Sequence, residues 1–220
     1  MDKTISVVVP VYISNTAQIP MTYKCLELAR KTSLPFELVI VETESQYFKD
    51  ADVYIYEKKR SNPNKSINRA FKVCSGDYIT LLTNDVFVEE GWLERLIECF
   101  SLPDCGLATL ASTQFNHIKQ DVITEGIWFS VAMMKKEDAW FDERYQSTWA
   151  DTDLITRLYL TGKKMYRNFN CVVEHKPGQT EYQKPDHQSN FELNKAKYRE
   201  KYKEHSESRI YKVFTEGWIV

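Results

Sequence analysis

The chain has 220 residues, and its 29 basic and 31 acidic side chains give a formal net charge of −2. For a chain of this length we expect one domain, alone or with a short appendage, rather than a long two-domain architecture. Because 43% of the residues are hydrophobic and 27% are charged, the composition is globular and excludes a chain that is disordered or polyelectrolyte throughout.

The first half of the sequence alternates between strand and helix patterns. An apolar run from Ile5 to Val11 predicts a strand buried on both faces, with Pro10 marking its end. A helix is expected over residues 20–32, and a second buried strand over residues 36–41.

A weaker third strand is expected over residues 53–56, and the apolar side chains from Ile67 to Cys74 then recur at helical spacing. Gly76 is expected to stop that helix. Residues 78–82 predict a fourth strand, and helical spacing returns over residues 93–100. Strands and helices that alternate through short links indicate βαβ units and a largely parallel sheet.

The second half is more mixed. Its patterns predict strands over residues 107–111, 128–134, 165–169 and 171–174, a helix over 151–160 that stops at Gly162, and a helix over 190–203. No internal repeat and no low-complexity segment occurs in the sequence.

Several features of the sequence bear on the location of the protein and on the way it would bind a nucleotide. No run approaches the ~18 apolar residues of a membrane span, and residues 1–4 lack the pattern of a signal peptide. The five cysteines are scattered and form no CxxC pair, which argues against a disulfide framework. We therefore expect a cytoplasmic protein without a transmembrane segment. With only seven glycines, it should bind any nucleotide without a glycine-rich loop.

Ligands of open parallel sheets bind beyond the carboxyl ends of the strands. The residues expected there are Pro10, Val11 and Tyr12 after the first strand, residues 42–45, beginning with Glu42, after the second, and Thr83, Asn84 and Asp85 after the fourth. Asp85 follows an apolar strand end, so its carboxylate should emerge at the mouth of the sheet, where Mg²⁺ or Mn²⁺ would take it as a ligand. A role for Asp85 in capping the next turn explains its position equally well.

A basic block extends from Lys58 to Lys72, with six basic residues and no acidic residue. In a loop that leads into a helix, such a block could hold a diphosphate. A solvated surface and a nucleic-acid contact are the alternatives. Phosphate binding is favoured over both because the block lies between two strands that should border the site.

Two carboxylates, Asp151 and Asp153, stand at the start of an expected helix, where the helix dipole favours negative charge. Residues two positions apart do not share a helix face, so at most one belongs to a site and the other caps or supports. Nearby Trp128, Tyr145 and Trp149 could form a platform for a sugar, although we favour core packing for each.

Several segments occur in the order that they have in a known family. They are residues 4–12, 38–42, 64–76, 77–86, 91–93 and 141–143, Asp151 with Asp153, Gly162 and His175. In this order they resemble the inverting family 2 glycosyltransferases, which use nucleotide sugars. The resemblance implies an α/β, Rossmann-like GT-A fold in which a mostly parallel central sheet is flanked by helices.

This resemblance spans residues 4–180. It implies one glycosyltransferase domain at residues 1–180, with a nucleotide-binding half at 1–105 and an acceptor-binding half at 106–180. Residues 181–220 lie beyond it and are expected to form a short helical tail.

The resemblance also implies roles for individual residues. Contacts to the nucleotide are assigned to Pro10, Tyr12, Glu42, Asn68, Arg69 and Asn84. Asp85 and His175 would ligate a divalent cation, Mn²⁺ or Mg²⁺, and Asp151 would be the catalytic base. Three residues depart from the family pattern: Thr83 stands where an Asp of the metal motif often lies, Ala150 where a Glu commonly precedes the base, and Glu42 in place of a shorter Asp.

The implied reaction transfers a hexose from a nucleotide sugar, with UDP-sugars favoured, to a hydroxyl group of a saccharide or other acceptor. It is a single displacement that inverts the anomeric carbon, and Asp151 takes the proton of the acceptor. Two alternatives remain open at this point. One is a non-catalytic module that binds nucleotide sugars or glycans, and the other, less favoured, is a protein that binds or modifies nucleic acid.

Overall fold

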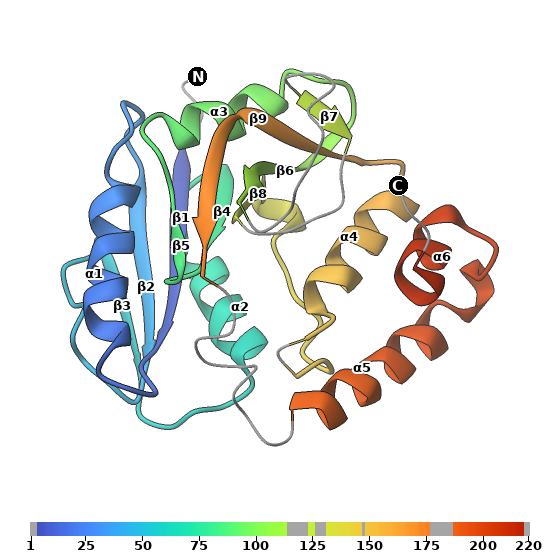
Figure 1. Ribbon diagram of the computed structural model, residues 1–220, viewed down its shortest axis with the longest axis horizontal. Coiled ribbons are helices and arrows are strands. Elements are labelled where there is room, and N and C mark those ends of the chain that lie inside the picture. Colours follow the sequence, from blue (N-terminus) through green and yellow to red (C-terminus); the bar gives the residue numbers. More distant parts are fainter. Residues whose placement is uncertain (1–3, 114–122, 126–130, 147, 177–186, 218–220) are drawn as a thin grey trace.

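The structure is a computed structural model that describes residues 4–113, 123–125, 131–146, 148–176 and 187–217. A central sheet is flanked by helices on both faces (Figure 1). Its strands are β1 (Ile5–Tyr12), β2 (Glu37–Thr43), β3 (Val53–Glu57), β4 (Tyr78–Leu82), β5 (Val86–Phe87), β6 (Cys105–Ser112), β7 (Ile123–Glu125), β8 (Val131–Lys135) and β9 (Lys164–His175). The α-helices are α1 (Gln18–Ala29), α2 (Pro63–Val73), α3 (Trp92–Cys99), α4 (Ala150–Leu160), α5 (His187–Lys201) and α6 (Arg209–Glu216).

The strand order is β3-β2-β1-β4-β8-β6-β9-β5, with β7 attached to β9. The first four strands of this order are parallel throughout, as the alternation of strands and helices predicts. They read as continuous apolar runs because helices cover both of their faces. The expected α/β fold, with its parallel central part, is therefore confirmed.

The chain changes direction of travel across the sheet between β1 and β4. From β1 it proceeds outward to β2 and β3, and it then returns to the other side of β1 to form β4. In such sheets the crevice at the carboxyl ends of the two strands that flank the change is the usual ligand site. This crevice lies between Tyr12, at the end of β1, and the residues after Leu82.

The first strand does not end at Pro10, as the sequence pattern predicted. It continues to Tyr12, and its pairing with β2 runs to Tyr12 opposite Thr43. Pairing with β4, in contrast, stops at Val8 opposite Leu81. Beyond Val8 the edge of β1 that faces β4 is therefore unpaired. Proline, which has no N–H group, is tolerated at position 10 for this reason.

The second half of the sheet is mixed. β8 runs antiparallel to β4 and to β6, whereas β6 and β9 are parallel. β9 is a single strand in place of the two short strands expected, and an irregularity in its pairing with β6 falls between Leu110 and Ala111. Of the strand expected over residues 128–134, residues 128–130 lie outside the described part of the chain.

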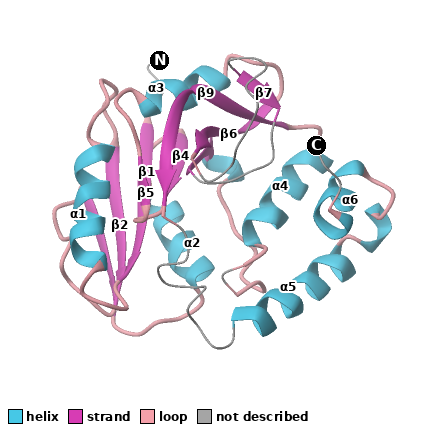
Figure 2. Cartoon of the chain, in the orientation of Figure 1, coloured by secondary structure: helices cyan, strands magenta, loops and turns pink. Residues whose placement is uncertain are grey.

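Two separate cores cover the two faces of the sheet, because alternate residues of a strand point to opposite faces. Val7 and Val9 of β1 join the core beneath α1 and α3, whereas Val8 joins the core beneath α2 and α4. α5 and α6 add to the second core through Tyr198, Tyr202 and Ile210. Figure 2 shows these two helices beside α4.

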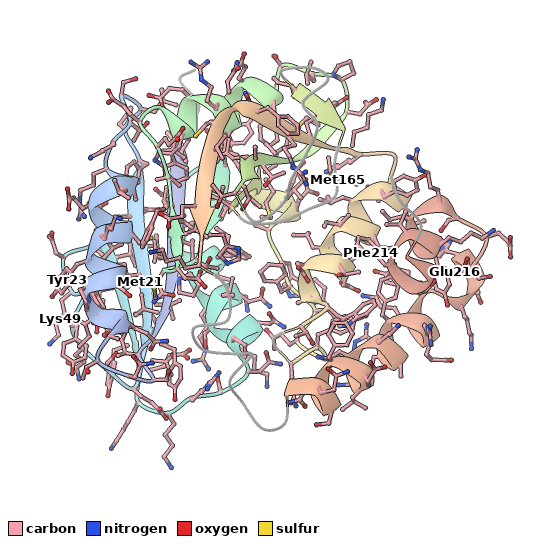
Figure 3. The ribbon with its side chains drawn as sticks, viewed as in Figure 1. Met21, Tyr23, Lys49, Met165, Phe214 and Glu216 are labelled. Carbon is pink, nitrogen blue, oxygen red and sulfur yellow. The ribbon has the colours of Figure 1, made fainter. Side chains whose placement is uncertain are left out.

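Helices α1 and α6 lie at opposite ends of the molecule (Figure 1). Phe214 of α6 packs against the second core, and Tyr23 of α1 lies on the opposite side of the molecule (Figure 3). Within the described residues, no helix is both long enough and apolar enough to cross a membrane.

Gly76 has a different role from the one its position predicted. α2 ends at Val73, and Gly76 has no positive φ of the kind that a glycine stop requires. Instead, a Cβ at Gly76 would lie 2.6 Å from the backbone nitrogen of Ser6 and 2.8 Å from the carbonyl carbon of Ile5. Glycine is needed because the chain crosses β1 at close range.

Candidate active site

Asp85 and His175 meet at the open end of the sheet. The short strand β5 pairs antiparallel with β9, which places His175 opposite Val86. The backbone N–H of Lys176 donates to the Asp85 carbonyl oxygen at 3.0 Å. As a result, His175 Nε2 lies 3.6 Å from Asp85 Oδ2, and each side chain is 19% exposed.

The other carboxylate oxygen of Asp85 bears on metal binding. Asp85 Oδ1 is buried and has no hydrogen-bond partner among the described residues. A buried, unpartnered carboxylate oxygen beside an imidazole nitrogen fits a divalent cation, since both groups are common ligands. The described residues contain no cluster of three or more such ligands, so substrate and water would complete the shell.

Tyr12 lies at the end of β1 and is covered by a cation. The guanidinium carbon of Arg60 is 4.1 Å from the centre of the Tyr12 ring. Arg60 is held in turn by its backbone N–H, which donates to Glu44 Oε1 at 3.0 Å. Glu44 has a φ of 65°, which is unusual for a residue with a side chain and marks a tightly constrained loop.

Glu42 is fully buried at the end of β2. Its carboxylate accepts four hydrogen bonds, from Ser45 Oγ at 2.7 Å, Tyr47 N at 2.8 Å, Phe48 N at 3.1 Å and Tyr54 Oη at 2.9 Å. These bonds use its acceptor capacity inside the protein. Glu42 therefore organises the loop after β2 from inside the protein.

Two of the asparagines expected near the nucleotide make contacts within the protein. Asn84 donates to Thr22 Oγ1 of α1 at 2.8 Å, which ties the loop after β4 to that helix. Asn68 is buried, and its amide donates to the Phe141 carbonyl oxygen at 2.8 Å and accepts from the Phe141 N–H at 2.8 Å. Asn68 thus connects α2 to the segment that precedes α4.

The two arginines of the basic block, which extends from Lys58 to Lys72, lie in different surroundings. Arg69 forms an ion pair with the buried Glu57 at 2.5 Å, although its own side chain is 58% exposed. Arg60 lies over Tyr12 at the open end of the sheet, as described above. Lys58, Lys59 and Lys65 are exposed. Of the basic residues described here, Arg60 is therefore the one that contacts a residue of the crevice, Tyr12.

The two carboxylates at the start of α4 have different surroundings. Asp153 is fully buried, and it binds Arg157 Nε at 3.1 Å, Tyr202 Oη at 2.9 Å and the ammonium group of Lys201. Asp151 is only partly buried, and Oδ1 accepts from the Thr152 N–H at 2.8 Å. Burial raises the pKa of the Asp151 carboxyl above its ordinary value. Asp153 is therefore engaged by side chains inside the protein, whereas Asp151 is partly exposed at the start of α4.

The aromatic residues near α4 belong to the core. Tyr145 is 1% exposed and Trp149 is 6% exposed, which excludes them as an open platform for a sugar in this structure. Trp128 lies outside the described residues. Core packing, the interpretation favoured from sequence, is confirmed for Tyr145 and Trp149.

Sequence analysis missed the asparagines that hold the segment before α4. Asn62 donates to the carbonyl oxygens of Glu143 and Tyr145, each at 2.7 Å, and Asn64 donates to that of Tyr145 at 3.0 Å. The only signal in the sequence was that Asn62, Asn64 and Asn68 lie within one short stretch. Without the fold, however, nothing indicated which segment their amides would bind.

Taken together, the fold and the site define an α/β protein of the GT-A type, with a parallel half that ends in polar residues and a mixed half that returns His175 to the same edge. The model of Glycosyl transferase family 2 matches residues 6–119, which is more than half of the chain. The chain belongs to this family. The resemblance noted in the sequence is confirmed.

Solved structures show the same fold at low sequence identity. TarS from S. aureus is 14% identical with a TM-score of 0.60 over 78% of this chain and 36% of its own. The mannosyltransferase PcManGT from Pyrobaculum calidifontis, solved with GDP-Man and Mn²⁺, is 15% identical with a TM-score of 0.62 over 82% of this chain and 59% of its own. The complex of TarS 1-349 from S. aureus with UDP is 15% identical, with a TM-score of 0.60 over 79% of this chain and 61% of its own.

The chain spans 36 to 61% of the length of these proteins. At such identities the likeness shows the fold alone. No curated protein sequence matches the chain.

Proposed function

We propose that this chain transfers a hexose from a nucleotide sugar to a hydroxyl group of a saccharide or other acceptor, with inversion at the anomeric carbon. The observation that carries the proposal is the pairing of Asp85 with His175 at the crevice between β1 and β4. Family membership supports the same reaction class.

Asp85 and His175 are the residues that would hold a divalent cation, because a buried Asp85 oxygen lacks a partner among the described residues. When bound, such a cation stabilises negative charge on the diphosphate that leaves the sugar. The structure of PcManGT with GDP-Man and Mn²⁺ supports this choice of cofactor.

Asp151 is proposed as the general base. It takes the proton of the acceptor hydroxyl while the acceptor oxygen forms a bond to the anomeric carbon. The bond from that carbon to the phosphate oxygen breaks, and the nucleoside diphosphate leaves with the electron pair. A carboxyl whose pKa is raised by burial is a stronger base, and such assistance contributes typically ~10² to 10⁴ in rate.

The donor side is proposed to lie along Tyr12, with Arg60 above its ring. The guanidinium group suits a diphosphate because it presents several N–H donors in one plane. A UDP-sugar is the favoured donor, and the solved complex of TarS 1-349 with UDP supports it. GDP-sugars are the main competitor, as in PcManGT.

The test is release of nucleoside diphosphate from a panel of UDP-, GDP- and dTDP-sugars with Mn²⁺ and a set of saccharide acceptors. We expect turnover with one donor and a loss of ~10² to 10⁴ in kcat for Asp151→Asn. Asp104→Asn is the matched control, because Asp104 is exposed and has a φ of 57°, which asparagine adopts readily. Binding without turnover, unchanged in Asp151→Asn, would instead identify a non-catalytic binding module.

A further inference from the structure

The C-terminal helix α5 contacts the segment that leads into α4. This helix lies beyond residues 6–119, the part matched by the family model. In Figure 1, α5 passes beside the start of α4, which carries Asp151. The contacts of α5 therefore join the C-terminal part of the chain to the segment that precedes Asp151.

Asn194 makes the most specific of these contacts. Its side chain is fully buried, and its amide nitrogen donates to the Gln146 carbonyl oxygen at 2.9 Å and to the Thr148 carbonyl oxygen at 3.1 Å. One turn along the helix, Lys197 Nζ donates to the Arg144 carbonyl oxygen at 2.8 Å. Two side chains of α5 thereby bind three backbone carbonyl groups of the segment before α4.

Lys201 joins both ends of the same segment. Its ammonium group lies 2.9 Å from Asp142 Oδ2 and also contacts Asp153 Oδ1. The two aspartate side chains are nearly inaccessible, at 3% and 0% exposed. Asp142 precedes Asp151 in the chain and Asp153 follows it, so Lys201 bridges two side chains that lie on either side of the proposed base in the sequence.

Trp149 shows that this part of the backbone is constrained. Its φ of 71° is strained for a residue with a bulky side chain, and such a conformation persists only where the surroundings impose it. The surroundings here are two rings of α5, Phe191 at 5.5 Å and Tyr198 at 5.2 Å between ring centres. Trp149 immediately precedes α4, so its backbone conformation sets the direction in which the chain enters the helix that carries Asp151.

The opposite side of the segment is held by α2, through the asparagine contacts described above. α2 contacts the segment before Asp151, whereas α5 contacts residues before it, such as Asp142 and Thr148, and also Asp153 after it. We propose that α5 is part of the catalytic unit and that Asn194 and Lys201 are positioning residues for Asp151. This inference rests on the proposed function.

Lys201→Met is a suitable probe because the charges that remain are balanced. Asp142 keeps its ion pair with Arg144, and Asp153 keeps its ion pair with Arg157. The variant removes the bridge from α5 while neither buried carboxylate loses its only cation. Lys203→Met is the matched control, since Lys203 pairs with Glu200 on the surface, where the two side chains are 63% and 75% exposed.

The experiment measures kcat and KM for the donor together with amide hydrogen exchange over residues 146–153. We expect Lys201→Met and Asn194→Ala to lower kcat by about 10- to 100-fold with the KM of the donor within about twofold, because small misplacements of a catalytic group have effects of this size. Exchange at the Asp153 amide, which bonds to the Trp149 carbonyl oxygen, should become faster. Lys201→Arg should restore most of kcat, and Lys203→Met should match the wild type.

Each outcome has a distinct meaning. If the wild type turns over and both variants keep kcat and exchange within about twofold of it, the inference is overturned. A variant in which kcat and donor affinity fall together, without rescue by Lys201→Arg, also overturns it in favour of a general structural role. If the wild type transfers no sugar, the proposed function fails, and exchange over residues 146–153 still decides whether α5 holds this segment.

Discussion

His175 Nε2 lies 3.6 Å from Asp85 Oδ2, although the two residues belong to different halves of the sequence. The antiparallel pairing of β5 with β9 creates this proximity. A backbone hydrogen bond from Lys176 to Asp85 fixes the register, so the distance does not depend on long, flexible side chains.

The pair leads to a prediction about metal dependence. Removal of divalent cations with a chelator should abolish transfer, and Mn²⁺ should restore it. Asp85→Asn and His175→Ala should each weaken Mn²⁺ binding, measured calorimetrically in the presence of nucleoside diphosphate, by at least about 10- to 100-fold. His205→Ala is the control, because His205 is exposed in the C-terminal region. Full activity in the chelator would contradict the prediction.

Asp151 leads to a prediction about pH. A general base acts only when it is deprotonated, and burial raises the pKa of the Asp151 carboxyl. The acidic limb of the kcat profile should therefore fall above the ordinary aspartate value of about 3.9. A profile of kcat from pH 4 to 9 checks this, and activity that is flat down to the ordinary value would argue against Asp151 as the base.

The same raised pKa has a consequence for stability. A group whose pKa is higher in the folded state contributes stability below its unfolded pKa, and that contribution is lost as the pH rises through the folded pKa. At pH 7 the ionised Asp151 should therefore be unfavourable for folding. Asp151→Asn should increase the free energy of unfolding at pH 7 by about 0.5–2 kcal/mol while lowering kcat. Urea unfolding measures the difference, and equal or lower stability of the variant would refute it.

Asp153 should behave in the opposite way. Its carboxylate is fully buried and joins Arg157, Lys201 and Tyr202. Removing one partner of a buried ion pair typically costs about 3–5 kcal/mol because the remaining charges lose their compensation. Asp153→Asn should therefore destabilise the fold strongly in urea, in contrast to Asp151→Asn. Similar midpoints for the two variants would show that the roles assigned to these aspartates are wrong.

Glu42 allows a test of the loop after β2. In Glu42→Gln an amide group must replace an oxygen that accepts from a backbone N–H, so one donor loses its acceptor. The expected cost is about 1–3 kcal/mol, with weaker binding of nucleoside diphosphate if the loop borders the donor. Calorimetric binding and urea unfolding measure the two effects. Glu27→Gln, on the exposed face of α1, should change neither.

Gly76→Ala tests the close approach to β1. The added Cβ would meet backbone atoms of Ile5 and Ser6 at less than 3.0 Å, and backbone cannot move aside as a flexible side chain can. A loss of about 1–3 kcal/mol is expected from such overpacking. Lys72→Ala, on the exposed surface of the preceding helix, should differ little from the wild type. Normal stability of Gly76→Ala would mean that β1 can shift without cost.

The parallel half of the fold could be predicted because its signals are local. Buried parallel strands are continuous apolar runs, and the stripe that starts at Ile67 has the period of a helix. The predictions that failed concerned residues whose meaning depends on a neighbour. Pro10 can lie within β1 because the pairing of β1 with β4 has already ended at Val8. Gly76 is required because the backbone of β1 lies too close to leave room for a Cβ.

For the site, local sequence patterns were sufficient to show that Asp85 follows an apolar strand and that Asp151 and Asp153 begin a helix. Both conclusions follow from hydrophobic periodicity, which is a property of short segments. The folded chain was needed to show that His175 lies against Asp85, that Asp153 is the buried partner of Lys201, and that Glu42 faces inward. These relationships join residues far apart in the chain, and their geometry comes from strand pairing and helix packing, which local patterns do not encode.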